Sequence, residues 1–433
     1  MQRYDSYKPS GIYFLSEFPS GWKIRKGKYL FNEENRPVHP GDEIVTCFRD
    51  GQVTLRKNRR VEGFTNSLKE IGYQGVRKGD LVIHNMDAFA GAIGISDSDG
   101  KATPVYSCCT PQSAEISQYY YCYLLRYLAR NGFILSLAKG IRERSTDFRF
   151  NDFKELYLPV PSRAEQDAIV SYLDTATAKI DSAIAQQQKM IDLLNERKQI
   201  IINNAVTKGL NPNAKMKDSG VEWIGEIPEG WDFVKLKHLT KIISKGTTPS
   251  TIGRDVLSNG TIRFLKAENI VNNAVCEKPE FYIDEVTHSI LKRSNLLEND
   301  LLFVIAGATI GKVAILPKEL TPANTNQAIS FVRLKNPEMS KYVWYVLQSE
   351  VTRNYIWSNA VQSAQPNISM EDLGNIQVPI PNVLEQKEII AYIETKISPI
   401  ENTIRNCQQQ ISFLQERKQI IINEVVTGKV KVV

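Results

Sequence analysis

The sequence predicts an α+β protein with two globular α+β domains separated by two long helices, which form an antiparallel coiled coil, and with an internal pseudo-twofold repeat. Three observations predict this fold. A chain of 433 residues is too long for a single hydrophobic core. The eight residues ERKQIIIN occur twice, at 196–203 and at 416–423. Each copy lies in a long segment whose apolar residues follow a heptad pattern.

The two copies belong to a longer match. Residues 158–209 align without gaps with residues 378–429, and 22 of these 52 positions are identical. A second match lies upstream, where SGIYFLSEFPSGW at 10–22 aligns with SGVEWIGEIPEGW at 219–231. The chain therefore contains a duplication, and each copy has an entry segment ending in Gly-Trp, a variable middle and a helical tail.

The repeat sets the predicted domain boundaries. We expect a first globular domain with its entry segment, a central repeated helical region, a linker with the second globular domain, and a C-terminal repeated helical region. These four parts span residues 1–157, 158–214, 215–377 and 378–433.

The helical tails carry a seam of apolar residues at alternating steps of three and four. In the first tail the predicted seam includes Ile169, Leu173, Ile180, Met190 and Leu194. About 40 residues give a rod of roughly 60 Å, which needs a partner helix in water. A plain dimerising coiled coil is one interpretation. The duplication favours the other, in which the two tails pair antiparallel within one chain and present the ERKQ segments twice, for two copies of one partner.

The middle segments predict short strands followed by an amphipathic helix. The strands lie in GDLVIH at 79–84 and in the glycine-containing stretch 299–316, and the helices span 119–138 and 340–360. Each middle therefore predicts a compact α+β domain.

No motif in the sequence predicts catalysis. GATIGK at 307–312 lacks the spacing of a phosphate-binding loop, and Val313 stands where that loop needs a hydroxyl. The six cysteines form no CxxC pair, so neither a zinc site nor any other metal or cofactor is expected in this chain. The N-terminus has no apolar signal segment and no stretch of the chain could span a bilayer, so we expect a cytoplasmic protein.

Basic and polar clusters in the middles predict recognition of nucleic acid, since arginine can bind guanine edges bidentately and amides can pair with adenine. The net charge of +6 is compatible with such a partner, although a solvated basic loop explains each cluster equally well. The candidate DNA-binding residues of the first middle are Arg56, Lys57, Arg59, Arg60, Arg142, Arg144 and Arg149. Those of the second middle are Lys245, Thr247, Thr248, Gln365 and Asn367.

The sum of these features resembles the specificity (S) subunit of type I restriction-modification systems. The residues that carry the resemblance are GVEWIGEIPEGW at 220–231, the PVP and PIP turns at 159–161 and 379–381, the Glu-Gln pair after each turn, and the twin helices with ERKQIIIN. The resemblance covers nearly the whole chain.

The resemblance implies a non-catalytic DNA sequence-specificity subunit of an adenine-N6 methyltransferase and ATP-dependent restriction endonuclease complex. Each variable domain would be a target-recognition domain for one half of a bipartite, asymmetric site in double-stranded DNA, and the helices would set the spacer. Two modification (methyltransferase) subunits with S-adenosylmethionine, and possibly two restriction subunits with ATP and magnesium, would be the partners. A DNA-binding regulatory protein or a scaffold without a methyltransferase is the alternative. The predicted partner-binding residues are Glu196, Arg197, Lys198, Gln199, Glu416, Arg417, Lys418 and Gln419.

Overall fold

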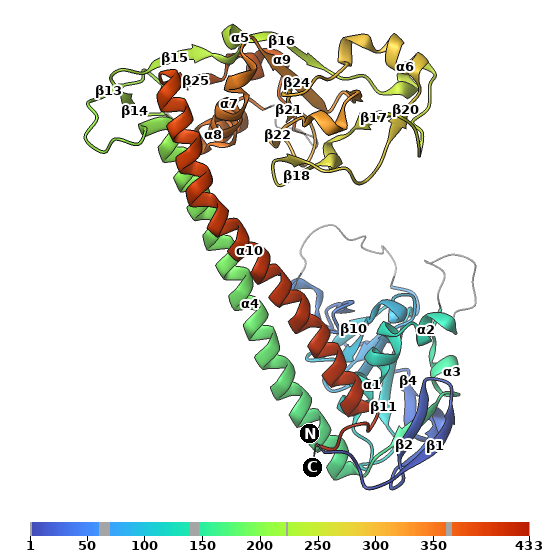
Figure 1. Cartoon of the computed structure of the whole chain (residues 1–433). Helices are drawn as coiled ribbons and strands as arrows, with labels where there is room; N and C mark the ends of the chain where they lie inside the picture. The colour runs from blue at the N-terminus through green and yellow to red at the C-terminus, as the bar shows by residue number, and fades with distance from the viewer. Residues whose placement is uncertain (1, 60–69, 138–146, 222–223, 361–365, 433) are drawn as a thin grey trace. The chain divides into compact units, whose positions relative to one another are not determined.

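Two compact units make up the chain in the computed structural model (Figure 1). The structure describes residues 2–59, 70–137, 147–221, 224–360 and 366–432. The first unit comprises residues 1–187 with 408–433, and the second comprises residues 188–407. Each unit thus combines one α+β domain with parts of both long helices. Because these units follow contacts and not the repeat, the boundaries expected from the sequence remain predictions.

The first unit begins with a hairpin and continues into the strands of its domain. The elements before its long helix are β1 (Tyr7–Ile12), β2 (Leu15–Pro19), β3 (Lys23–Lys26), β4 (Phe31–Glu34), β5 (Val45–Cys47), β6 (Val53–Leu55), β7 (Gln74–Val76), β8 (Leu81–His84), β9 (Ile93–Ile95), β10 (Gly100–Ala102), β11 (Tyr106–Pro111), α1 (Gln118–Arg130), α2 (Phe133–Ser136), α3 (Phe150–Phe153) and β12 (Tyr157–Val160). The long helix α4 (Arg163–Lys208) follows and continues into the second unit.

The second unit has the same order with additional short elements. They are β13 (Met216–Asp218), β14 (Glu226–Pro228), β15 (Asp232–Lys235), α5 (Leu236–Leu239), β16 (Thr240–Lys245), β17 (Ile262–Leu265), β18 (Ile270–Val271), β19 (Ala274–Val275), β20 (Tyr282–Ile283), α6 (Glu285–Ile290), β21 (Leu301–Val304), β22 (Val313–Ile315), β23 (Ala323–Thr325), β24 (Ile329–Leu334), α7 (Ser340–Gln348), α8 (Glu350–Asn359), α9 (Met370–Asn375) and β25 (Gln377–Ile380). The second long helix, α10 (Val383–Val426), ends in the first unit.

Both domains are built on one sheet topology. The first contains an antiparallel four-stranded sheet in the order β4-β11-β8-β9, and the second contains its counterpart, β16-β24-β21-β22. A separate pair joins the entry segment to the strand before the long helix, β3 with β12 and β15 with β25. The duplication therefore extends through the variable middles, where the sequences hardly match.

The central strands of the two sheets keep the register of the repeat. β8 and β21 lie 220 positions apart, as do β9 and β22 and also β12 and β25. Leu81, Val82 and Ile83 are buried, as are Leu301 and Leu302. Different apolar residues can fill equivalent buried positions. The two strands therefore occupy equivalent places in their sheets although most of their residues differ.

The domains differ outside this shared sheet. The first adds a hairpin of β5 and β6, and the second adds the sheet β20-β17-β23, in which β17 pairs parallel with β23. That second sheet has its own small core around Ile262, Phe264 and Ile283.

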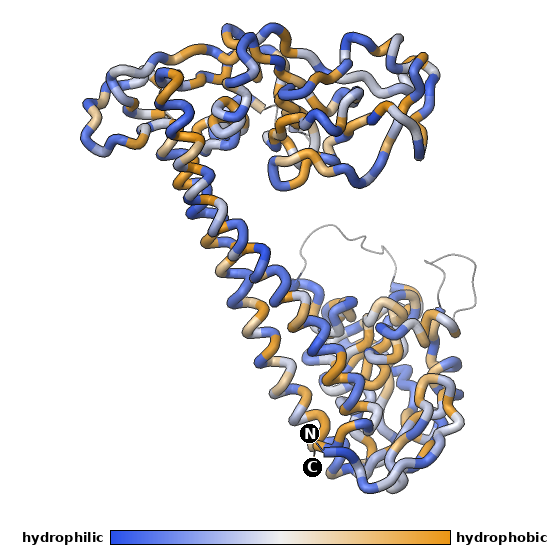
Figure 2. The backbone as a smooth tube through the Cα atoms, in the orientation of Figure 1, coloured by the Kyte–Doolittle hydropathy of each residue, from blue (hydrophilic) through white to orange (hydrophobic). Residues whose placement is uncertain are grey.

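The long helices α4 and α10 run antiparallel within each unit (Figure 1). In the first unit Ile169 and Leu173 of α4 share a core with Val425 of α10, and in the second Ile202 shares a core with Ile389. Figure 2 shows hydrophobic and hydrophilic residues mixed along both helices, as a seam on one face requires. The predicted antiparallel pairing is confirmed.

The predicted seam is wrong in the middle of α4. Met190 is 48% exposed, whereas the next residue, Ile191, is buried. A straight α-helix has 3.6 residues per turn, so a seam extended in heptads drifts by about 20° per repeat and passes to a neighbouring residue.

The Gly-Trp that ends each entry segment packs against the end of a long helix. Trp22 and Trp231 are both 2% exposed. Each lies against the glycine that follows an ERKQIIIN helix, Trp231 against Gly209 and Trp22 against Gly428, where a Cβ would meet the indole at 3.1 and 2.8 Å. Both glycines have φ near +70°, which explains why glycine ends each helix.

Each helix predicted after the sheet is divided in two. In the second unit Ser349 separates α7 from α8, and its hydroxyl accepts a hydrogen bond from the Thr352 amide at 3.4 Å as the N-cap of α8. In the first unit Gly132 has φ of +76° between α1 and α2. The spacing of apolar residues alone predicts one continuous helix in each unit. Local capping residues divide that helix in two.

Candidate nucleic-acid interface and the repeated helix faces

One end of the four-stranded sheet in the second unit gathers the four described members of that unit's predicted polar residues, Lys245, Thr247, Thr248 and Asn367. β16 ends there at Lys245, which is exposed. The chain then turns past the end of β23, where the Thr247 amide donates to the Thr325 carbonyl at 3.1 Å. The Thr248 hydroxyl donates to the side-chain oxygen of Gln327.

Asn367 lies at the same edge, beyond β21. Its backbone forms an antiparallel bridge with Ala306, and the Ile368 amide donates to the Ile305 carbonyl at 2.9 Å. Asn367 is exposed. At about 4.8 Å per strand, it stands roughly 14 Å from the threonine turn across this edge. Gln365 lies outside the described residues.

The corresponding edge of the first unit carries arginines. The Phe148 amide donates to the Asn85 carbonyl at 3.0 Å, which places the adjoining Arg149 beside the end of β8. On the other side of the same turn, the Arg49 guanidinium contacts the Asp87 carboxylate at 2.8 Å. Arg49 is an exposed edge residue that sequence reasoning missed, and its place in the turn FRDG between β5 and β6 was the available signal.

The predicted arginines of this edge are neutralised within the chain. The Arg149 guanidinium lies 2.6 Å from the Asp147 carboxylate. Arg59 lies 2.7 Å from the Asp50 carboxylate, with its guanidinium 4.2 Å from the centroid of the Phe48 ring. A phosphate or a base that binds these arginines must therefore compete with exposed carboxylates, which hold them weakly.

Two further predicted cations of the first unit, Arg56 and Lys57, are not brought to this edge. Arg56 donates to the Thr46 hydroxyl at 3.2 Å, and Lys57 lies 2.5 Å from the Glu43 carboxylate, both at the open end of the β5–β6 hairpin. The structure thus separates the side chain of Arg59 from those of Arg56 and Lys57. Arg60, Arg142 and Arg144 lie outside the described residues.

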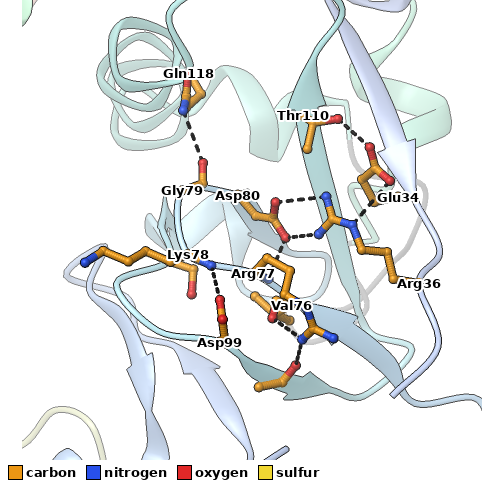
Figure 3. A network of polar contacts seen from close by, with 12 residues as sticks. Glu34, Arg36, Val76, Arg77, Lys78, Gly79, Asp80, Asp99, Thr110 and Gln118 are labelled. Carbon is orange, nitrogen blue, oxygen red and sulfur yellow. Dashed lines mark hydrogen bonds and ion pairs between the residues drawn. The ribbon is translucent and has the colours of Figure 1, made fainter. Parts of the chain in front are cut away.

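A buried aspartate in the turn before the central strand supports both sheets. In Figure 3 the Asp80 carboxylate accepts two hydrogen bonds from Arg36, at 2.6 and 3.2 Å, and one from the Arg77 amide at 2.8 Å. This bidentate contact raises the pKa of Arg36. Asp300 makes the equivalent bonds with Arg333, at 2.8 and 2.7 Å, and with the Leu297 amide at 2.8 Å.

The repeated Glu-Gln pairs fasten each long helix to its domain. Gln166 is fully buried and donates to the Pro161 carbonyl at 3.0 Å, while Gln386 donates to the Pro381 carbonyl at 2.9 Å. Tyr121 and Tyr342 each donate to the carbonyl of the first proline of the neighbouring proline turn, at 3.0 Å. Burial raises the pKa of both tyrosines, so they remain protonated donors. These motifs are structural.

The repeated lysines of ERKQ join the two long helices. Lys418 contacts both carboxylate oxygens of Asp181 at 2.7 Å in the first unit, and Lys198 pairs with Glu401 in the second. Both pairs use equivalent positions of the repeat, since 181 and 401 differ by 220 just as 198 and 418 do. The lysines therefore stabilise the pairing of the helices.

The outward part of each ERKQ segment is an exposed face with apolar ends. Glu196 and Arg197 are exposed between Leu193 and Ile200, which are 52% and 51% exposed. Positions i, i+3, i+4 and i+7 share one side of a helix. In the other copy the same four positions are Phe413, Glu416, Arg417 and Ile420, all exposed. We call these two surfaces the ERKQ faces.

The glutamines of the two ERKQ segments have different surroundings. The side-chain oxygen of Gln199 accepts a hydrogen bond from Arg353 of α8 at 2.9 Å. Gln419 instead lines a groove beside α1. The repeated letters therefore meet different neighbours in the two units.

Within the described residues, no three His, Cys, Asp or Glu side chains are placed to hold a metal ion. Burial raises the pKa of the Cys122 thiol to about 11 and that of Cys108 to about 12, so neither forms a thiolate readily at neutral pH. None of the helices in the described part of the chain combines the length and the apolarity needed to cross a membrane.

Comparison with protein families finds one match. Residues 228–410 match the model of the type I restriction modification DNA specificity domain. This range contains the second domain and the start of α10.

Comparison with individual proteins finds relatives with one common description. The chain is 27% identical over 312 residues to the type I restriction enzyme MjaVIII specificity subunit of Methanocaldococcus jannaschii, covering 70% of this chain and 68% of the relative. It is 23% identical over 450 residues to the putative type I restriction enzyme MjaX specificity subunit of the same organism, covering 96% of each.

Among solved structures, a chain described in a study of complex assembly and conformational transition of the type I R-M system has the same fold. Its TM-score is 0.68 at 14% identity, and the alignment covers 95% of this chain and 99% of the other.

Proposed function

Because the chain belongs to the specificity subunits of type I restriction-modification systems, we propose that its two globular domains are target-recognition domains for a bipartite DNA site. One observation carries this proposal: two sheets of the same topology present different side chains at the same edge. Two domains with the same sheet topology but different exposed side chains at the strand ends suit two unlike half-sites, and hence an asymmetric target.

Arginines and amides at the sheet edges make the base and phosphate contacts. In the first domain these are Arg59 and Arg149, with Arg56, Lys57, Arg60, Arg142 and Arg144 as further contacts of residues 1–157. In the second domain Lys245, Thr247 and Thr248 hold phosphate or base edges, while Gln365 and Asn367 pair with adenine. Arg59 and Arg149 must leave their carboxylates on binding, so the broken ion pairs offset part of their attraction to phosphate at the first half-site.

The long helices set the distance between half-sites and dock the modification subunits. Antiparallel pairing of duplicated helices suits two half-sites on antiparallel strands. The ERKQ faces bind one modification subunit each, with Glu196, Arg197, Glu416 and Arg417 at their centres. Lys198, Gln199, Lys418 and Gln419 contribute by holding the faces in place.

The chemistry of the complex belongs to those partners. The modification subunits bind S-adenosylmethionine and methylate adenine at N6, and two restriction subunits add ATP- and magnesium-dependent cleavage. The specificity subunit is non-catalytic, needs no cofactor of its own, and works in the cytoplasm.

A methylation map tests this function. The chain is expressed with a type I methyltransferase subunit from its own genome, and N6-methyladenine is mapped across a plasmid by single-molecule sequencing. We expect one split, asymmetric motif methylated on both strands. A stable complex that methylates no motif would contradict the specificity role and favour a scaffold, and specific DNA binding by the chain without a methyltransferase would favour a regulatory protein.

A further inference from the structure

A groove of about 580 Å³ lies in the first unit between α1, α4 and α10. Along α1 its lining residues are spaced three and four apart, from Tyr119 to Arg130, so they form one face of that helix. Opposite them stand residues of α4 from Val170 to Asp181. The groove thus extends over about three helical turns, roughly 17 Å.

The groove opens beside one ERKQ segment. Lys418, Gln419 and Ile422 of α10 line it, and they adjoin Arg417 and Ile420 of the ERKQ face on the same helix. A partner seated on that face therefore also reaches the mouth of the groove.

Most charges in the groove have partners inside the chain. Asp181 is held by Lys418, and Asp50 is held by Arg59. The Asp174 carboxylate accepts a hydrogen bond from the Tyr123 hydroxyl at 2.7 Å.

Two arginines are the exception. Arg126 and Arg130 stand one turn apart on α1, and no carboxylate among the described residues lies within 4.0 Å of either guanidinium. Arg126 donates from one nitrogen to the carbonyls of Gly91 and Ile93, both at 3.1 Å, which leaves its other donors available. Arg130 is exposed at one end of the groove, yet partial desolvation and the charge of Arg126 lower its pKa while the Asp181 charge acts in the opposite direction, so an anion between the two arginines would reduce their repulsion.

The equivalent groove of the second unit is smaller, about 280 Å³, and has two ion pairs at its rim. Tyr345 occupies the place of Tyr123, and Glu394 that of Asp174. The rim pairs Lys341 with Glu394 and Lys198 with Glu401. Gln348 stands where the first unit has Arg126, and α7 ends at this residue, so it carries no counterpart of Arg130. The paired arginines therefore distinguish the first groove.

We propose that the groove of the first unit receives a carboxylate side chain of the modification subunit docked on the adjacent ERKQ face, with Arg126 and Arg130 as its ligands. This inference rests on the proposed function. Two guanidinium groups on neighbouring turns can bind one carboxylate through charge-assisted, bidentate hydrogen bonds. Tyr119 and Tyr127, which also line the groove, offer further hydroxyl donors, and Tyr123, whose hydroxyl is held by Asp174, adds its ring to the apolar wall. The two modification subunits are then held unequally, since only one meets an arginine pair.

Reversal of one exposed charge tests the proposal. Arg130→Glu is compared with Lys179→Glu, which makes the same charge change at an exposed lysine of α4 that does not line the groove. Binding of the purified modification subunit to each full-length chain is measured by isothermal titration calorimetry, and folding by thermal denaturation. We expect Arg130→Glu to weaken one of the two binding events roughly tenfold to a hundredfold, while Lys179→Glu leaves both unchanged.

Three other outcomes would overturn the proposal. Wild-type affinity of both copies for the Arg130→Glu chain would show that the arginine takes no part in docking. Unchanged assembly with weakened binding of the assembled complex to plasmid DNA would identify a DNA phosphate as the anion. Failure of the wild-type chain itself to bind the modification subunit would instead remove the proposed function on which the inference stands.

Discussion

The two domains of this chain share their buried frame and differ where they are exposed. Both bury an aspartate before the central strand and fasten a tyrosine to a proline turn. At the sheet edge the first domain presents arginines paired with carboxylates, whereas the second presents a threonine turn and Asn367. The two domains thus share these buried polar contacts together with the sheet topology. The exposed side chains at the sheet edge differ between the domains, as recognition of two different targets requires.

The largest expected effect is a loss of stability, equal in the two domains, when the buried aspartate before the central strand is removed. Asp80→Ala and Asp300→Ala each leave an arginine without its bidentate partner, and we expect each to cost about 3 kcal/mol of stability in its own unit. Hydrogen exchange of the strand amides, resolved by unit, measures the loss.

Matched controls remove an exposed carboxylate near each site, Asp97→Ala and Glu298→Ala. These should change stability by less than about 0.5 kcal/mol. A large loss in one domain alone would mean that the two aspartates are not equivalent.

A smaller effect separates the domains by function. Asn367→Ala should relax the second half-site and Arg149→Ala the first, with about 1–3 kcal/mol of lost discrimination for a bidentate base contact. Methylation maps of the two variants measure the change. An equal loss at both half-sites would indicate a fault in assembly and would refute the division of labour between the edges.

The smallest effect concerns the ion pairs between the helices. Each acid of these pairs is about half exposed, so double-mutant cycles of Lys418 with Asp181 and of Lys198 with Glu401 should each give at most about 1 kcal/mol, falling with added salt. Urea denaturation measures the coupling. A coupling free energy of several kcal/mol would contradict this prediction, because it would make these ion pairs major contributors to the stability of the helix pairing.

The parts of this fold that the sequence predicts are the parts that repeat. The apolar period and the two ERKQIIIN copies predict both long helices, and strands are found where 79–84 and 299–316 predict them. The shared sheet topology could not be predicted, because strands such as LVIH and LLFV satisfy the same burial with different residues. The one repeated polar letter there, Asp80 and Asp300, was the available signal.

Site residues are less predictable than elements because their roles depend on neighbours far away in sequence. The ERKQ motif predicts one surface, yet its lysines face Asp181 and Glu401 on the partner helix and only Glu and Arg point outward. LRKNRR predicts one basic patch, but the hairpin directs Arg59 and Lys57 to different ends. Arg126 and Arg130 form no motif, and α1 brings them together only once it is folded.

The central claim is that two domains of the same fold recognise different half-sites through the different side chains at their sheet edges. A chain with two identical domains tests this claim most directly. Residues 232–378 are replaced by a second copy of residues 23–158, so that the fusions fall at the shared Gly-Trp and proline turns, and the chain is expressed with a type I methyltransferase subunit from its own genome. A methylation map should then show the first half-site twice, in inverted orientation, across the original spacer. Retention of the original asymmetric motif, or a stable complex that methylates no site, would contradict the claim.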